Sequence, residues 1–318
     1  MVVGGAGFIG SHLAEALASS GVDTVIYDDF SSGYFANIPT NIADVVVGRV
    51  EDTSALGEAA RSSDFIFHLA AVSSVARCQS DISNSYSTNA GGVASAIQAS
   101  ARGAKRPALI FASSAAVYGT PASASIDENA DKAPISFYGL AKLNGERLLQ
   151  MASRHHQLRS VALRLFNVYG PRQDRSSPYS GVISLFADRL GKAEALVVYG
   201  DGQQTRDFIY VKDVVAHFLA AATMVQRPSF IEGFVPINVC TGVGTSINTL
   251  ARSLSEIFDV PLRTIGMPPR EADIRSSVGN NERAKELLSS PKLTALRDGL
   301  LEYVRAEFPN AGSLRAPI

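Results

Sequence analysis

The sequence has little of several features that mark particular classes of protein. Its two cysteines, Cys78 and Cys240, have no metal-ligand spacing around them, so neither a disulfide framework nor a metal site is predicted. A net charge of −1 gives no reason to expect nucleic acid or an anionic membrane as a partner. The longest apolar stretches, such as residues 219–225, are far too short to cross a bilayer. These shortages favour a globular protein of the reducing cytoplasm.

The amino terminus and the bulk composition support the same expectation. No basic segment followed by an apolar one precedes Gly4, so no signal peptide is predicted. Only about three residues remain there for a first strand, where five or six are usual, so we expect the natural start to lie upstream or the chain to have been trimmed. A chain of 318 residues with 46% hydrophobic and 19% charged residues can bury a large core, as one large domain or two modest ones.

The first half of the chain alternates short β-branched runs with amphipathic helical segments. Buried strands are predicted at residues 22–27, 43–47, 65–69, 109–111 and 160–165. Helices are predicted at residues 11–20, 53–61 and 84–102, and another carries Tyr138. Alternating units of this kind build a parallel sheet with helices on both faces. We therefore predict an α/β fold in which residues 1–167 form a Rossmann-type, doubly wound parallel sheet.

The pattern changes after Asn167. Residues 171–178 read as a polar loop, and residues 196–199 as a short strand before the turn Gly200-Asp201-Gly202. Further helices are predicted at residues 181–190, 211–225, 247–258, 282–288 and 293–308. A strand at 235–239 can rejoin the first sheet. We predict a smaller C-terminal α/β substrate domain over residues 168–318, with segments around 208–239 crossing back to the first domain.

A glycine-rich loop lies between the first strand and the first helix. Gly4, Gly7 and Gly10 stand three residues apart there. Glycine permits the tight turn and the close approach of backbone to a pyrophosphate, and the N–H groups that begin the helix face the phosphates. Asp28 follows the second strand, 18 residues after Gly10. A carboxylate there accepts hydrogen bonds from an adenosine ribose and repels a 2′-phosphate, which favours NAD over NADP; the alternative is that Asp28 only caps a turn.

Tyr138 and Lys142 form a Tyr-x-x-x-Lys pair, which places both side chains on one face of a helix. A phenol has a pKa of about 10 in water. We expect the lysine ammonium and an oxidised nicotinamide to lower that value, giving a proton acceptor beside a hydride acceptor. The pair alone is common by chance, and on its own it reads as a pair on a helix surface.

With the blocks around them, these residues closely resemble the extended short-chain dehydrogenase/reductase family, in its NAD-dependent nucleotide-sugar epimerase/dehydratase branch. The resemblance runs nearly from end to end through seven ordered blocks. They are GGAGFIGSH at the start, HLAA at 68–71, SSAAVYG at 113–119, YGLAK at 138–142, LRLFNVYGPRQ at 163–173, GDGQQTRDFIYVKDV at 200–214 and PREADI at 269–274. It implies NAD as cofactor, a UDP-sugar as substrate, and a homodimer.

The resemblance also implies roles for single residues. The catalytic residues are expected to be Ser114, Tyr138 and Lys142. The cofactor is expected to contact Gly4, Gly7, Phe8, Ile9, Gly10, Asp28, the Val50 backbone, Leu69, Ala70, Asn89, Tyr138 and Lys142. The substrate is expected to contact Ser73, Ser114, Asn167, Gln173, Arg206, Arg270, Asp273 and Ser277. For His68 a structural role is the better interpretation.

The chain departs from the family pattern at a few positions. Arg49 stands where an aspartate is expected to face the adenine amino group, which puts that contact in doubt. Val3 replaces a usual threonine, and Ala272 replaces a glycine before Asp273. Gly279-Asn280 replaces a usual Ala-Asp pair, so that loop is expected to differ in shape.

The branch contains 4-epimerases, 4,6-dehydratases and decarboxylases, which all begin by oxidising C4 of the sugar. By resemblance, dehydratases carry Asp-Glu after the catalytic hydroxyl residue, and glucuronate decarboxylases carry a glutamate there, where this chain has Ala115 and Ala116. This favours a 4-epimerase, which needs no further acid. A tyrosine at the position of Ser277 is common in enzymes restricted to glucose and galactose, so the serine predicts that N-acetylhexosamine is accepted as well.

Two other readings stay open. A UDP-glucuronate 4-epimerase would share every catalytic residue but would need a cation beside the sugar carboxylate, which the sequence does not locate. A dinucleotide-binding protein without chemistry is disfavoured because Tyr138 and Lys142 are both present. The expected homodimer would use helices at residues 84–102 and 138–154, where Ala94, Ala96 and Ala99 would allow close approach; packing against the chain's own sheet is equally compatible with them.

Overall fold

The computed structural model describes residues 1–318 except 104, 122, 175–180, 270–273, 290–291 and 310–318. Its centre is a seven-stranded sheet of order β10-β6-β5-β4-β1-β2-β3, in which every pair of neighbours is parallel. The strands are β1 (Val2–Val3), β2 (Val25–Asp28), β3 (Asp44–Val47), β4 (Phe65–His68), β5 (Ala108–Ser114), β6 (Ser160–Leu165) and β10 (Phe234–Val239). The predicted α/β fold with a doubly wound parallel sheet is confirmed.

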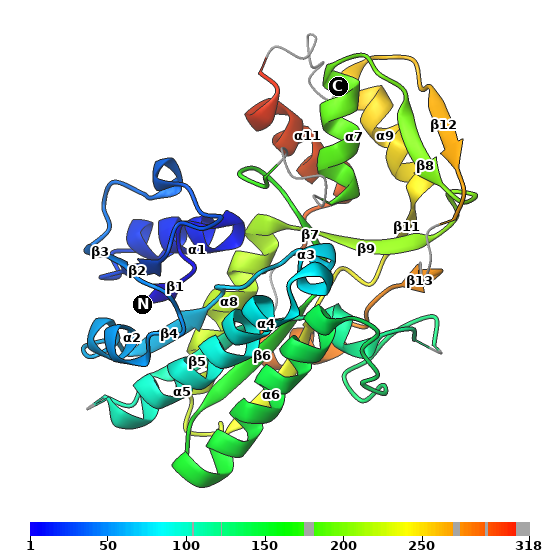
Figure 1. Ribbon diagram of the computed structural model, residues 1–318. Coiled ribbons are helices and arrows are strands. Elements are labelled where there is room, and N and C mark those ends of the chain that lie inside the picture. Colours follow the sequence, from blue (N-terminus) through cyan, green and yellow to red (C-terminus); the bar gives the residue numbers. More distant parts are fainter. Residues whose placement is uncertain (104, 122, 175–180, 270–273, 290–291, 310–318) are drawn as a thin grey trace.

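Helices cover both faces of this sheet (Figure 1). One face packs against α1 (Phe8–Ser19), α8 (Val211–Gln226) and α10 (Glu282–Leu288). The other packs against α2 (Thr53–Ala59), α5 (Gly92–Arg102) and α6 (Phe137–His156). Successive side chains of a strand point to opposite faces. Val2 is therefore buried with the first set of helices, and Val3 with the second.

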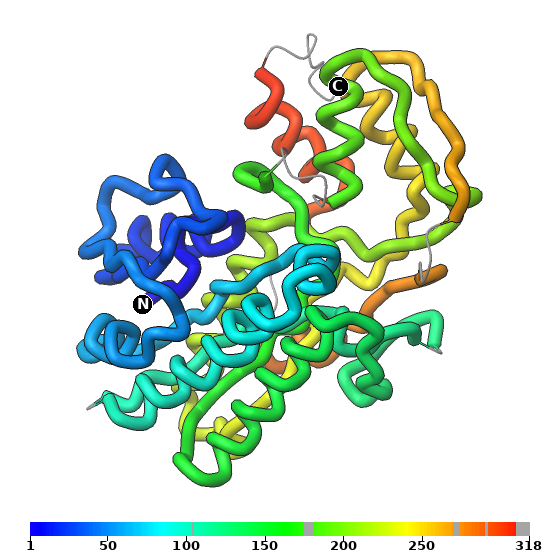
Figure 2. Tube along the Cα trace, in the orientation of Figure 1, coloured from blue at the N-terminus to red at the C-terminus, as the bar shows by residue number. Residues whose placement is uncertain are grey.

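The smaller part of the molecule has its own core. It contains the helices α7 (Val182–Gly191), α9 (Ile247–Phe258) and α11 (Leu296–Glu307). A two-stranded sheet joins β8 (Leu196–Tyr199) to β12 (Thr264–Met267). Figure 2 shows this part built from green to red segments late in the chain, while the yellow segment after α8 lies in the main body. Because β10 pairs with β6, residues beyond Asn167 complete the large sheet.

A four-stranded sheet connects the two parts. Its central strand, β9 (Thr205–Tyr210), pairs with β7 (Asn167–Tyr169), β11 (Gly244–Ser246) and β13 (Ser276–Ser277). None of these strands is among the predicted ones, and β7, β11 and β13 have only two or three residues each, which carry too little periodicity to be recognised. Their partners are also far away in sequence.

Several predicted elements differ in their bounds from the structure; the strand predicted at 109–111, for example, is the longer β5. The second strand begins at Val25 and not at Val22, which is 48% exposed in the loop before it. The predicted helix at 84–102 is three elements: α4 (Ile82–Tyr86), a π-helical turn at Ser87–Gly91, and α5. Short helices α3 (Val75–Ser80) and η3 (Ala115–Tyr118) lie near its start and after β5. The π turn matters for the site, because it contains Asn89.

Two further features are absent from the described residues. No described helix combines the length and apolarity needed to span a membrane. Nor does this part of the chain contain three or more histidine, cysteine or carboxylate side chains grouped as a metal site.

Candidate active site

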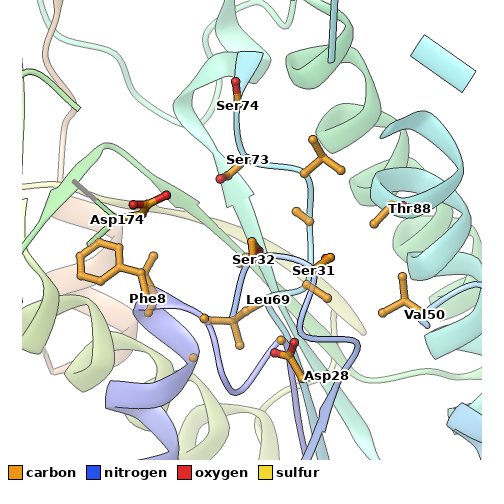
Figure 3. Close-up of a pocket in the computed structure, with 18 of the residues that line it drawn as sticks. Phe8, Asp28, Ser31, Ser32, Val50, Leu69, Ser73, Ser74, Thr88 and Asp174 are labelled. Atoms are coloured by element: carbon orange, nitrogen blue, oxygen red, sulfur yellow. The ribbon is translucent and has the colours of Figure 1, made fainter. Parts of the chain in front are cut away.

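A cavity of about 770 Å³ opens where strands of the large sheet end at their carboxyl edge. Ligands of open α/β sheets bind at this edge. Figure 3 shows Val50 and Thr88 on one side of the cavity, Phe8 and Asp174 on the other, and Asp28 and Leu69 between them. The cavity wall also contains Ser114, Tyr138 and Lys142. The fold therefore brings the predicted dinucleotide loop and the predicted catalytic residues to one site.

The glycine loop has the shape that a dinucleotide requires. Gly4 has φ +81°, and a Cβ on it would lie 2.5 Å from the Ala70 backbone nitrogen. A Cβ on Gly10 would overlap the Gly4 carbonyl. No side chain caps the first turn of α1, which begins at Phe8 beside the cavity. Its N–H groups are therefore available to an anion, so the residues present fit a pyrophosphate.

Asp28 ends β2 and supports this loop. Its carboxylate accepts hydrogen bonds from the backbone nitrogens of Ala6 and Phe30, both at 2.9 Å. Burial raises the pKa of Asp28 from its ordinary value. The side chain also lines the cavity, so it holds the loop while keeping lone pairs for a ligand hydroxyl. The turn-capping role and the predicted ribose role are compatible.

Tyr138 and Lys142 occupy the first turns of α6. Ser136 caps this helix by accepting a 3.1 Å hydrogen bond from the backbone nitrogen of Gly139. Lys142 Nζ donates to the Ala112 carbonyl at 2.8 Å and lies 5.8 Å from the centre of the Tyr138 ring. Lys142 is almost wholly buried, and burial lowers its pKa to about 8. The lysine is thus fixed against β5 beside the phenol.

The pKa of Tyr138 differs from the sequence-based expectation. Burial is the largest effect and raises the pKa of Tyr138 to about 12, although a hydrogen bond with Ser114 acts in the lowering direction. The Lys142 ammonium, 5.8 Å from the ring centre, does not offset this effect of burial. The protein without a bound ligand therefore keeps the phenol protonated at neutral pH. The expected positive charge of an oxidised nicotinamide lies outside this chain and is needed for the predicted shift.

A buried polar network lies behind the catalytic residues. Glu146, one turn after Lys142, accepts hydrogen bonds from Arg164 at 2.9 and 2.7 Å and from Ser113 Oγ at 2.5 Å. Arg164 Nη1 also donates to Tyr118 OH at 2.9 Å. The network joins β5, α6, β6 and η3, so it fixes the strand end that carries Ser114 relative to the helix that carries Tyr138.

Asn89 takes a supporting position. It is buried, and its amide pairs with Val72 by accepting from the backbone nitrogen at 2.7 Å and donating to the carbonyl at 3.0 Å. The π turn directs Asn89 toward the loop after β4. That loop carries Leu69, Ala70 and Ser73 into the cavity wall. His68 is fully buried, its ring nitrogens have no hydrogen-bond partner among the described residues, and burial lowers its pKa to about 3. It stays neutral, as a structural histidine does.

The predicted substrate residues fall into two groups. Ser73 and Gln173 line the cavity. Asn167, Arg206 and Ser277 gather instead around β9, where Asn167 pairs with Phe208 and Ser277 with Arg206. Arg206 Nη1 donates to the Ile274 carbonyl at 2.7 Å and so holds the chain next to β13. The predicted Arg270 and Asp273 lie outside the described residues.

Several cavity residues are not among the predicted ones. Polar ones among them are Ser31 and Ser32 after β2, Ser74 and Arg77 near α3, Asn84 on α4, Thr88 in the π turn, and Arg172 and Asp174 after β7. Ser31 and Ser32 belong to a polar run that begins at Asp28, which is a turn signal after a strand. The others have no local signal, because they reach the cavity only through the packing of separate elements. The remaining predicted cofactor residues Gly7, Ile9 and Val50 do line it.

Comparison with known proteins agrees with this geometry. The chain matches the NAD dependent epimerase/dehydratase family over residues 1–232. It belongs to that family. A UDP-glucose 4-epimerase of Mycolicibacterium smegmatis is 33% identical over 96% of each chain. A UDP-N-acetyl-alpha-D-glucosaminuronate decarboxylase of Bacillus cytotoxicus is also 33% identical over 96% of each chain.

A solved structure of a similar protein has a similar fold. The UDP-N-acetylglucosamine 4-epimerase of Methanobrevibacter ruminantium, in complex with UDP-N-acetylmuramic acid, is 31% identical and has a TM-score of 0.89 over 96% of each chain. The family is NAD-dependent, and its members similar to this chain include both epimerases and a decarboxylase. The chain is therefore a nucleotide-sugar epimerase/dehydratase family protein, and the identity alone does not separate these reactions.

Proposed function

We propose that this protein is an NAD-dependent 4-epimerase of UDP-sugars, which inverts C4 through a transient 4-keto sugar. The observation that carries the proposal is the placement of Ser114, Tyr138 and Lys142 in one cavity with the glycine loop, while Ala115 and Ala116 follow Ser114. Two of the similar proteins act as 4-epimerases on UDP-glucose and UDP-N-acetylglucosamine, as their names state.

Tyr138 carries out the proton transfer at the sugar. Its phenolic oxygen accepts the proton of the 4-hydroxyl and returns it after inversion. Ser114 hydrogen-bonds Tyr138 and orients the hydroxyl that loses its proton. Lys142, fixed on the Ala112 carbonyl, holds the ammonium beside the ring. NAD, when bound, supplies a hydride acceptor for C4 and a positive ring charge near the phenol.

Elimination and decarboxylation are disfavoured by the residues after Ser114. Ala115 and Ala116 form the start of η3 and have no group that donates or accepts a proton. In the dehydratases and glucuronate decarboxylases that the chain resembles, these positions carry acids. An epimerase needs only the one proton acceptor that Tyr138 provides.

The substrate range follows from Ser277. It is half-buried in β13, paired with Arg206, and leaves more space than a tyrosine would. We therefore propose activity on UDP-N-acetylglucosamine and UDP-N-acetylgalactosamine as well as on UDP-glucose and UDP-galactose. Ser277→Tyr should lower the rate on the N-acetylated pair relative to the other pair, and Ser277→Ala is the matched control. An unchanged ratio of rates in the tyrosine variant would contradict this role of Ser277.

A uronate substrate is the second candidate, because one observation favours it. Arg77 lines the same cavity as Ser73 and Ser74, so a cation is present in the cavity wall with these two serines. Asp174 also lines this cavity, and its carboxylate would repel a second one. Rates on UDP-glucuronate for the wild type and for Arg77→Gln separate the candidates. A higher rate on the uronate than on neutral sugars, lost in Arg77→Gln, would favour the uronate epimerase.

One experiment tests the reaction itself. The purified protein is denatured and its released nucleotide is identified by mass spectrometry, and a second sample is assayed for interconversion of UDP-N-acetylglucosamine and UDP-N-acetylgalactosamine. We expect bound NAD, inversion without net NADH, and a loss of about 100-fold or more in Tyr138→Phe. Steady accumulation of NADH, or full activity in Tyr138→Phe, would overturn the proposal. Retention of NAD without any turnover would instead indicate a binding protein.

We also propose that the protein is a homodimer. Large apolar side chains are exposed on α4 and α6, where Ile82 is 44%, Tyr86 42% and Met151 49% exposed. Such a patch is typical of an interaction surface. Ala96 and Ala99, in contrast, are buried within the chain's own core and do not reach this surface. Light scattering should give twice the chain mass, and Met151→Glu should give the single-chain mass; a monomeric wild type would contradict this.

A further inference from the structure

The end of β3 forms the part of the cavity nearest to Asp28. Val47 is in register with Asp28, and the next residue, Gly48, donates from its backbone nitrogen to the Asp28 carbonyl at 3.1 Å. Gly48, Arg49 and Val50 all line the cavity. If Asp28 holds the adenosine ribose, as the proposed function requires, the purine attached to that ribose lies beside this segment. Figure 3 shows Val50 and Thr88 forming this side wall.

The Arg49 side chain is held in a defined orientation. Its guanidinium donates to both carboxylate oxygens of Glu51, at 3.3 Å from Nε and 3.2 Å from Nη2. Nη2 also donates to Asn84 Oδ1 at 3.3 Å. The backbone beneath it is fixed as well, because the Arg49 carbonyl accepts a 2.9 Å hydrogen bond from Tyr27 OH. The guanidinium remains largely exposed, so one edge is open to a ligand.

The acceptors near Arg49 are already engaged. Glu51 Oε1 accepts from Arg49 and, at 2.6 Å, from Thr88 Oγ1, while Oε2 accepts from Arg49 Nε. Asn84 Oδ1 is directed at the guanidinium, which leaves its amide nitrogen as a donor. Thr88 Oγ1 donates its hydrogen bond to Glu51 and keeps its acceptor lone pairs. The Arg49 guanidinium and the Asn84 amide therefore offer donors at this end of the cavity, and Thr88 Oγ1 offers an acceptor.

Arginine and aspartate read the 6-position of a purine in opposite ways. Adenine carries a 6-amino donor, whereas hypoxanthine carries a 6-oxo acceptor. A carboxylate can accept from the 6-amino group but not from the 6-oxo group, whereas a guanidinium can donate either to the unprotonated N1 of adenine or to the 6-oxo group of hypoxanthine. We propose that Arg49 makes this dinucleotide site indifferent to the purine 6-substituent, so that it binds nicotinamide hypoxanthine dinucleotide as well as NAD. The proposal rests on the proposed function only for the presence of a dinucleotide in the cavity.

A competition experiment tests this without any activity assay. The full-length protein is stripped of nucleotide, incubated with an equal mixture of the two dinucleotides, freed of unbound ligand and denatured, and the released nucleotides are measured by mass spectrometry. For the wild type we expect a ratio within about threefold of one. Arg49→Asp and Arg49→Glu each replace the donor by a group that only accepts, so both should favour NAD by about tenfold, the worth of one hydrogen bond. Arg49→Lys keeps a donor and should stay near the wild-type ratio.

The outcomes are distinct. A wild type that prefers NAD by tenfold or more, or aspartate and glutamate variants that keep the wild-type ratio, would overturn the inference and leave the epimerase proposal intact. Thermal unfolding monitors the folding of both carboxylate variants, in which a second carboxylate would face Glu51, and the ratio is measured in each variant that stays folded. A wild type that retains neither dinucleotide would overturn the inference together with the proposed NAD site.

Discussion

Replacing Glu146 by glutamine should lower the free energy of unfolding by about 3–5 kcal/mol, the cost of leaving a buried charge without its partner. The side chains of Glu146 and Arg164 are each only 3% exposed and meet at 2.7 Å. The guanidinium cannot lose its proton, and the carboxylate beside it raises the pKa of Arg164 further. Glutamine keeps the shape of the side chain, but its amide nitrogen must face a donor of Arg164 in either orientation, because both carboxylate oxygens accept from that guanidinium.

Urea unfolding followed by circular dichroism measures this change. The midpoint should fall while the slope stays constant, because the same surface is exposed on unfolding. Glu58→Gln is the matched control, since Glu58 pairs with Arg61 at the surface, with side chains 73% and 76% exposed, and an exposed pair contributes about 0–1 kcal/mol. Equal effects of the two substitutions would refute the assignment of the network as a buried support. Arg164→Met combined with Glu146→Gln should recover part of the loss, because no cation is then stranded.

Three further predictions concern the cavity. Gly10→Ala should abolish retention of NAD, because the added Cβ overlaps the Gly4 carbonyl, and a wild-type amount of nucleotide released on denaturation would contradict this. In the nucleotide-free protein, stability relative to Lys142→Met should rise as the pH goes from about 8 to 10.5. In that window the unfolded lysine binds a proton that the folded one has lost, an effect on the order of 3 kcal/mol measurable by urea unfolding. The difference in absorbance at 295 nm between wild type and Tyr138→Phe should show no phenolate from Tyr138 below pH 10 without nucleotide, because burial raises its pKa to about 12. With NAD bound the phenolate should appear at lower pH, and identical titrations would contradict the role given to the nicotinamide charge.

The elements of the large sheet were predictable because each carries its own signal. β6 was predicted with the bounds that the structure shows, and the sequence there is a continuous buried strand. The glycine loop was predictable for the same reason, since its spacing has a steric meaning that the contacts of Gly4 and Gly10 bear out. The π turn at Ser87–Gly91 was not predictable, because its composition is that of an ordinary helix. Its cause is tertiary: it directs Asn89 toward Val72 in another loop.

The candidate site shows the same division between local and distant causes. Tyr138 and Lys142 lie on one helix, so their spacing alone placed them on one face. One partner of Arg49, Glu51, is two residues away in the sequence, whereas the other, Asn84, comes from a segment that meets Arg49 only in the folded chain. From the sequence alone, Arg49 therefore predicted only that the usual adenine contact is in doubt. Its role as a positioned donor depends on Glu51 being engaged by Thr88, which no spacing along the sequence indicates.

The Tyr138 pKa shows that residue types and spacing are not enough to predict the direction of a pKa shift, even within a recognised Tyr-x-x-x-Lys pair. A nearby ammonium lowers the pKa of a phenol, whereas removal from water raises it. The Tyr-x-x-x-Lys spacing reveals the first effect only. In the folded chain Lys142 is itself withdrawn from water, which lowers its own pKa to about 8 and weakens the charge it offers near neutral pH. Both members of the pair are therefore shifted toward their neutral forms by the same burial, and the base becomes effective only when a further positive charge enters the cavity.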